Sequence, residues 1–122
     1  MTSDNLSDLS RQICEVSDIY ADRFGISRSP SWFLAKLTEE LGELVAADLK
    51  CEGNGRTAEQ SAEGLVNSRA EEAADLFAHL LLFCRDRGID LETALARKWF
   101  KYLGQDTERI PGTETESQSR QR

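Results

Sequence analysis

The carboxylates with metal-binding spacing lie in two short segments of the sequence. Glu39, Glu40 and Glu43 belong to TEELGELVAAD, and Glu72 and Asp75 belong to EEAADLFAHLLLF. Side chains three or four positions apart lie on one side of a helix, so each segment presents acids from one face. Carboxylate oxygens are the hard ligands that Mg²⁺ and Mn²⁺ prefer, whereas Zn²⁺ usually takes Cys and His ligands. The two segments together predict a site for Mg²⁺, with Mn²⁺ able to substitute.

The position of two of these acids argues against a purely solvated acidic surface. A run of charges on a helix is usually solvated, and that interpretation would hold for the first cluster alone. Glu40, however, lies on the apolar stripe of its segment, and Glu72 lies on the apolar stripe of the other. Burying ionised carboxylates together costs several kcal/mol per ion. Because a bound cation would offset that cost, the two clusters favour a metal site.

Four helices are expected to position these acids. Apolar residues recur at three- and four-residue steps in four segments, at about 6–20, 30–49, 60–87 and 91–103. Gly25 and Gly88 follow the first and third segments as stops. Pro30 suits the first turn of the second helix, and Asp90 is a good N-cap for the fourth. The segment 51–59 is rich in glycine and polar residues, which predicts a flexible connection that could close over a ligand.

These elements predict an all-α fold. No strand pattern or internal repeat is visible, and long amphipathic helices with short connections are typical of an antiparallel four-helix bundle. Residues 1–104 are expected to form this helical domain. Residues 105–122 are polar and lack a core-building pattern, so we expect a disordered tail.

Composition excludes several classes of function. A chain of 122 residues suits one domain, and its net charge of −7 argues against nucleic acid as a partner. The three cysteines lie far apart and have no metal-ligand spacing, which indicates reduced thiols. No apolar run is long enough for a membrane span, and the first residues lack the features of a signal peptide. We therefore expect a soluble cytoplasmic protein that does not interact with membranes.

The acidic motifs also resemble those of a known family. EELGE followed by EAAD resembles the EExxE and ExxD signature of the MazG-like all-α nucleoside triphosphate pyrophosphohydrolases. KLTEELGELVAA, EEAADLFAHLLLF and RGIDLETALARKW look like the family's second, third and fourth helices in order, over roughly residues 32–102. The resemblance implies a MazG-like bundle that is completed by oligomerisation, as a homodimer or homotetramer with the site near the subunit interfaces.

The resemblance further implies a reaction and roles for the acids. Members of this family cleave a nucleoside triphosphate between its α and β phosphates and require magnesium. Glu40, Glu43, Glu72 and Asp75 match the metal-binding acids of the family motifs. Glu39 matches the first acid of EExxE and is the candidate catalytic residue, as a further metal contact or as the group that orients the attacking water.

Other residues are candidates for contacts with the substrate. Lys98 and Lys101 could meet the far phosphates, and Trp32 at a helix start could stack on a base. Lys36 could also reach phosphate, but its spacing from the first acidic cluster favours an ion pair on the helix surface. His79 lies on an apolar face, where a lone histidine is usually a core residue hydrogen-bonded to a neighbouring helix. We therefore leave His79 out of the predicted site.

The function that we prefer is a hydrolase of nucleoside triphosphates for nucleotide-pool housecleaning. Three alternatives are considered beside it. A di-iron carboxylate bundle would need Glu-x-x-His motifs, which the acids here lack. A phosphoribosyl-ATP pyrophosphohydrolase of the same superfamily would use the same acids. A non-enzymatic helical module would use its acidic face to bind a basic partner and would need no metal, so stabilisation by magnesium would distinguish it.

Overall fold

The chain, in a computed structural model, is described at residues 6–53 and 60–104. These residues form four α-helices and a 3₁₀ helix: α1 (Leu6–Phe24), α2 (Pro30–Cys51), α3 (Ala62–Arg87), α4 (Leu91–Lys98) and η1 (Phe100–Tyr102). No strand occurs within the described residues, so the predicted all-α class is confirmed. The predicted disorder of residues 105–122 and most of the predicted flexible connection lie outside the described residues.

The helix ends follow from local capping chemistry. The Ser29 hydroxyl accepts a hydrogen bond from the Trp32 amide at 3.3 Å at the start of α2. The Asp90 carboxylate accepts one from the Thr93 amide at 3.1 Å at the start of α4, and this bond lowers the pKa of Asp90. Gly88 ends α3 in the left-handed conformation with a φ of 68°, which glycine adopts without steric cost. The predicted N-cap at Asp90 and the predicted stop at Gly88 are thus observed.

The fourth helix is shorter than predicted. The α-helix ends at Lys98, whereas the sequence pattern predicted one that continues to Leu103. Beyond Lys98 the backbone tightens, and the amides of Tyr102 and Leu103 donate to the carbonyls of Trp99 and Phe100 over 3.2 and 3.0 Å. Such 3₁₀ bonds are common where a helix ends.

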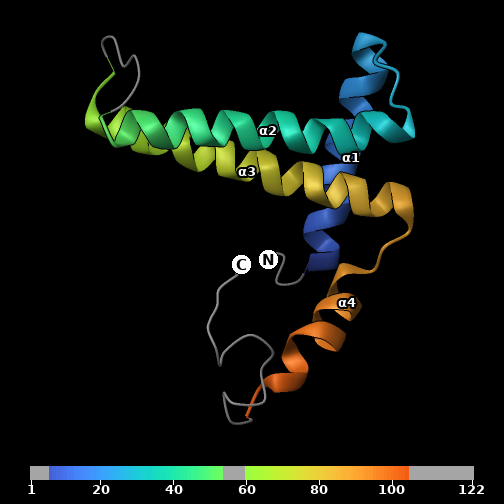
Figure 1. The fold of residues 1–122 in the computed structure, drawn as a ribbon. Coiled ribbons are helices and arrows are strands. Elements are labelled where there is room, and N and C mark those ends of the chain that lie inside the picture. The colour runs from blue at the N-terminus through green and yellow to red at the C-terminus, as the bar shows by residue number, and fades with distance from the viewer. Residues whose placement is uncertain (1–5, 54–59, 105–122) are drawn as a thin grey trace. The chain divides into compact units, whose positions relative to one another are not determined.

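Helices α2 and α3 form a long antiparallel hairpin, and α1 crosses it at one end (Figure 1). A buried apolar cluster joins these three helices. Cys14 of α1, Phe33 of α2 and Leu82 of α3 form one buried cluster, in which each residue is no more than 5% exposed. Leu81 and Leu82, near the end of the LFAHLLLF segment of α3, are 2% and 3% exposed.

A polar cluster also connects the three helices. Both Arg85 guanidinium nitrogens Nη1 and Nη2 donate to Asp18, at 3.1 and 2.9 Å, so α3 holds α1 by a bidentate ion pair. Arg28, between α1 and α2, donates to Asp18 at 3.0 Å and to the Ser17 hydroxyl at 2.8 Å. Hydrogen bonds from Arg85 and Arg28 lower the pKa of Asp18 to about 2. Asp18 is therefore the common acceptor that ties α1 to the segments on both sides of it.

The chain divides into two compact units, residues 1–89 and residues 90–122. The first contains the α2–α3 hairpin and α1, and the second contains α4 and η1. The closed four-helix arrangement over residues 1–104 stays a prediction. None of the helices described is long and apolar enough to cross a membrane. The three cysteines are free thiols, and burial raises the pKa of Cys84.

Helix α2 carries an apolar face that the described part of the chain leaves open. Leu34, Leu41, Val45 and Leu49 follow one another at steps of seven and four residues and therefore share one side of the helix. Their exposed fractions lie between 42% and 51%. Monomeric proteins rarely expose a continuous apolar surface of this kind, so this face is a candidate contact for another chain.

Candidate metal centre

Four carboxylates from the α2–α3 hairpin meet in one cluster. Glu40 and Glu43 of α2 and Glu72 and Asp75 of α3 each offer an oxygen, and these four oxygens lie within 4.8 Å of one another. The i, i+3 spacing on each helix places one acid a turn beyond the other, and the antiparallel packing brings the two pairs together. The structure thus assembles the four predicted metal ligands into a group that could hold a metal ion.

Two oxygens of this cluster are buried without a hydrogen bond. Glu40 is 5% exposed, and its Oε1 finds no hydrogen-bond partner among the residues described. The same is true of Oε1 of the half-buried Glu72. A buried oxygen without a partner costs about 1–3 kcal/mol, and more when it carries charge. A cation bound between the helices would satisfy both oxygens, so these two atoms fit a hard divalent ion.

The mutual repulsion of the acids is visible at Glu43. The negative charge of Glu40 raises the pKa of Glu43, and partial loss of hydration and the charge of Glu72 add to the effect. Glu43 itself is exposed. The direction of this shift means that the cluster accumulates negative charge, which a bound cation would offset.

Lys36 places a positive charge in direct contact with the acids of α2. Its Nζ lies 3.0 Å from Oε1 of Glu39 and 3.2 Å from Oε2 of Glu40. Burial alone would lower the pKa of Lys36, but the hydrogen bonds that its ammonium group donates to Glu39 and Glu40 outweigh that effect and raise it. The predicted ion pair of Lys36 with the first acidic cluster is confirmed. Glu39 binds Lys36 and is not a member of the four-carboxylate group.

The predicted substrate-binding residues lie in different parts of the chain. Trp32 is in the first turn of α2, with its ring edge-on to Phe33 at a centroid distance of 5.0 Å. Lys98 ends α4, and Lys101 lies in η1, where its Nζ is 5.3 Å from the centroid of the Tyr102 ring. Both lysines belong to the second unit, so the carboxylate cluster is built by the first unit alone. Their contacts with phosphate stay predictions.

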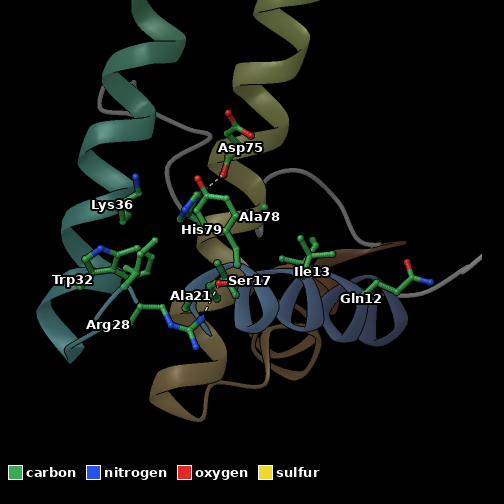
Figure 2. A pocket seen from close by; sticks show the side chains of 14 residues that line it. Gln12, Ile13, Ser17, Ala21, Arg28, Trp32, Lys36, Asp75, Ala78 and His79 are labelled. Atoms are coloured by element: carbon green, nitrogen blue, oxygen red, sulfur yellow. Dashed lines mark hydrogen bonds between the residues drawn. The ribbon is translucent and has the colours of Figure 1, made fainter. Parts of the chain in front are cut away.

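His79 occupies a more open position than the sequence indicated. Its Nδ1 lies 2.9 Å from the backbone carbonyl oxygen of Asp75 in the same helix. The expected hydrogen bond to a neighbouring helix was therefore wrong, because the carbonyl one turn back in α3 is within reach of the ring. His79 and Asp75 both line a pocket that α1 helps to form (Figure 2). Because Asp75 and His79 are four residues apart on one face of α3, the sequence could have suggested that both line one site. The sequence pattern of α1 does not show that α1 forms a wall of the same pocket.

Comparison with models of protein families finds no match, and comparisons with curated proteins and with solved structures find none either.

Proposed function

We propose that the chain is a magnesium-dependent nucleoside triphosphate pyrophosphohydrolase. The observation that carries the proposal is the pair of buried, unpartnered oxygens of Glu40 and Glu72 within a group of four carboxylates. An acidic group of this kind would repel a free triphosphate, but it binds a magnesium complex of one. The EELGE and EAAD motifs resemble those of the MazG-like pyrophosphohydrolases, and this resemblance indicates the reaction, which is cleavage between the α and β phosphates.

In the proposed reaction, water adds to phosphorus and the bond that links the α and β phosphates breaks, which gives a nucleoside monophosphate and pyrophosphate. Glu40, Glu43, Glu72 and Asp75 would hold the metal. When bound, Mg²⁺ supplies positive charge that neutralises the phosphate oxygens as the bond breaks. Glu39 lies outside the four-carboxylate group, and we assign it the orientation of the attacking water.

The ion pairs of Lys36 suit this arrangement. Lys36 occupies Oε2 of Glu40 and so leaves Oε1 as the oxygen available to a metal. The same ammonium group bonds to Glu39, so it fixes the orientation of the proposed water-binding carboxylate relative to the metal-binding one. Lys36 is thus a positioning residue for both acids.

The burial of Glu40 argues against the alternative of a non-enzymatic acidic interaction module. A basic partner protein would need to reach the carboxylates from outside, and a side chain that is 7% exposed offers it little surface. A small cation can enter where a lysine or arginine side chain from another protein would have to be desolvated.

We further propose that a second copy of the chain covers the apolar face of α2 and completes a four-helix bundle. The face, Leu34, Leu41, Val45 and Leu49, has the seven- and four-residue steps of helices that pack nearly parallel to one another. A second hairpin would supply a surface of matching length and chemistry. A closed dimer of this kind would use the same face on both copies.

The proposed activity is tested with purified full-length protein and a panel of ribo- and deoxynucleoside triphosphates, with and without magnesium. Chromatography should show monophosphate and pyrophosphate that form only with the metal. Diphosphate and orthophosphate would place the cleavage at a different bond. Absence of turnover with every nucleotide, together with absence of stabilisation by magnesium, would reject both the enzyme and its metal site.

A further inference from the structure

A pocket of about 770 Å³ opens between α1, α2 and α3 (Figure 2). Ligand pockets in proteins commonly have volumes of about 300–1,000 Å³, so this one can take a group much larger than a water molecule or an ion. Asp75 lines the pocket and is also one of the four clustered acids. The pocket and the candidate metal centre therefore share Asp75, and Lys36 of the pocket lining contacts Glu40 of the cluster.

The walls of the pocket are mainly apolar and come from all three helices. Helix α1 contributes Ile13 and Val16, α3 contributes Ala78 and Leu82, and α2 contributes the indole of Trp32. Trp32 is only partly buried, so its ring is available to a ligand while it also packs against the core. A flat apolar ring could stack on the indole and fill the space between α1 and α3.

A few polar groups are placed where such a ring would meet the cluster. The ring centroids of Trp32 and His79 are 6.2 Å apart, and both side chains line the pocket. A backbone carbonyl can only accept a hydrogen bond, so Nδ1 of His79 carries the proton that is directed to the oxygen of Asp75. In the neutral imidazole, Nε2 is then an acceptor that is left for a ligand.

Lys36 marks the boundary between the apolar and the ionic halves of the site. Its Nζ lies 5.9 Å from the centroid of the Trp32 ring and within 3.2 Å of Glu40. The site therefore changes from an aromatic wall to a positive charge and then to the carboxylates. A ligand that matches this order has a planar ring at one end and a metal-binding anionic chain at the other.

We propose that this pocket binds the base of a nucleotide, with Trp32 as the stacking surface and Nε2 of His79 as acceptor for an N–H group on the edge of the base. The inference rests on the proposed function for the phosphate end of the ligand. It adds that α1 forms one wall of the substrate site and that the base is recognised separately from the phosphates.

The test uses nucleosides, which carry the base without the phosphates. In full-length protein with Trp99→Phe, Trp32 is the remaining tryptophan and reports on the pocket by its fluorescence. Titration with adenosine, guanosine, cytidine and uridine without magnesium should give saturable quenching for at least one of them. If none quenches the fluorescence or competes with a hydrolysed triphosphate, the proposal is overturned.

A filling substitution provides the second measurement. Ala78→Leu should weaken binding of the quenching nucleoside at least tenfold and raise the KM of the triphosphate, with little change in kcat, because it occupies the ring space. The matched control is Ala74→Leu, on the same helix, exposed, and not part of the pocket lining. Stabilisation by magnesium should persist in both variants, and its persistence in Ala78→Leu shows that the hairpin still folds. Equal binding in both variants would overturn the proposal.

These outcomes separate the pocket from the proposed function. Nucleoside binding that Ala78→Leu abolishes, in a protein without triphosphate turnover, would support the pocket and reject the pyrophosphohydrolase. Turnover with an unchanged KM in Ala78→Leu would support the enzyme and reject the pocket. Loss of oligomers in Ala78→Leu, without nucleoside binding in the parent protein, would show that a second copy fills the space, and would also reject the proposal.

Discussion

Glu40 of α2 and Glu72 of α3 each keep one buried carboxylate oxygen that no described residue hydrogen-bonds, and both belong to a cluster whose ligand oxygens lie within 4.8 Å of one another. Two helices that packed only for stability would gain by replacing such acids with apolar residues, because buried charges without partners are costly. The arrangement therefore fits a function that needs the charge. Binding of a divalent cation is such a function.

Neutralising either buried acid should abolish metal-dependent activity. We expect Glu40→Gln and Glu72→Gln to lower turnover on the order of 100-fold or more, because transition-state stabilisation by the metal amounts to several kcal/mol. The metal-free variants should be as stable as the parent protein or more stable, since each loses a buried negative charge. Urea unfolding and turnover assays measure both effects. Glu71→Gln, at an exposed position next to Glu72, is the control and should change neither.

Magnesium should stabilise the folded protein against unfolding. At a concentration about 100 times the dissociation constant, we expect a gain of about 2.7 kcal/mol in the free energy of unfolding. Thermal unfolding with increasing MgCl₂, at ionic strength held constant with NaCl, measures it. The same titration on Glu40→Gln separates site binding from general screening. An identical gain in this variant would contradict a site at Glu40.

Removing the Lys36 ammonium should destabilise the metal-free protein. Lys36→Met leaves Oε2 of Glu40 without its ion pair while the carboxylate stays buried. We expect a loss of about 1–3 kcal/mol in the free energy of unfolding, of which magnesium restores a part. Lys50→Met, in the last turn of the same helix, is the matched control. An equal loss in both variants would show that the ion pair with Glu40 does not matter.

The Asp18 ion pairs should contribute stability that acid removes. The folded-state pKa of Asp18 is about 2, below its ordinary value of 3.8. A lowered pKa means that the contribution is fully present above the unfolded-state value and is lost as the pH falls from about 4 towards 2. The carboxylate is 49% exposed, so solvent screening limits the contribution to about 1 kcal/mol.

Replacing Asp18 checks this pH dependence. Asp18→Asn should be less stable than the parent protein at neutral pH, and the difference should shrink below pH 4 and disappear below pH 2. Asp22→Asn, at an exposed position of the same helix, should show no such convergence. Denaturant unfolding at a series of pH values provides the comparison. A difference that is constant with pH would mean that the charge of Asp18 is not what stabilises the fold.

A charge on the apolar face of α2 should disrupt the proposed dimer. We expect Val45→Glu to shift the protein to a monomer in light scattering after size-exclusion chromatography, because an unpaired charge cannot be buried cheaply in an interface. Ala46→Glu adds the same charge at an exposed position beside this face and should leave the mass unchanged. A parent protein that is already monomeric at every concentration tested would reject the dimer.

The sequence by itself determined the local features of this protein. Helical periodicity placed Glu40 with Glu43 on one side of α2 and Glu72 with Asp75 on one side of α3, because a turn of helix fixes the directions of nearby side chains. The stop at Gly88 follows from the freedom of glycine in the left-handed conformation. These relations need only a few neighbouring residues, so they could be predicted without knowledge of the fold.

Only the tertiary structure decided how distant segments meet. The register of α2 against α3 depends on packing such as that of Phe33 with Leu82 and Cys14, residues that are far apart in the sequence. That register brings the four acids of the two helices together. The pocket likewise exists because α1 crosses the hairpin. Periodicity within one helix carries no information about which other helix packs against that helix, or in which register.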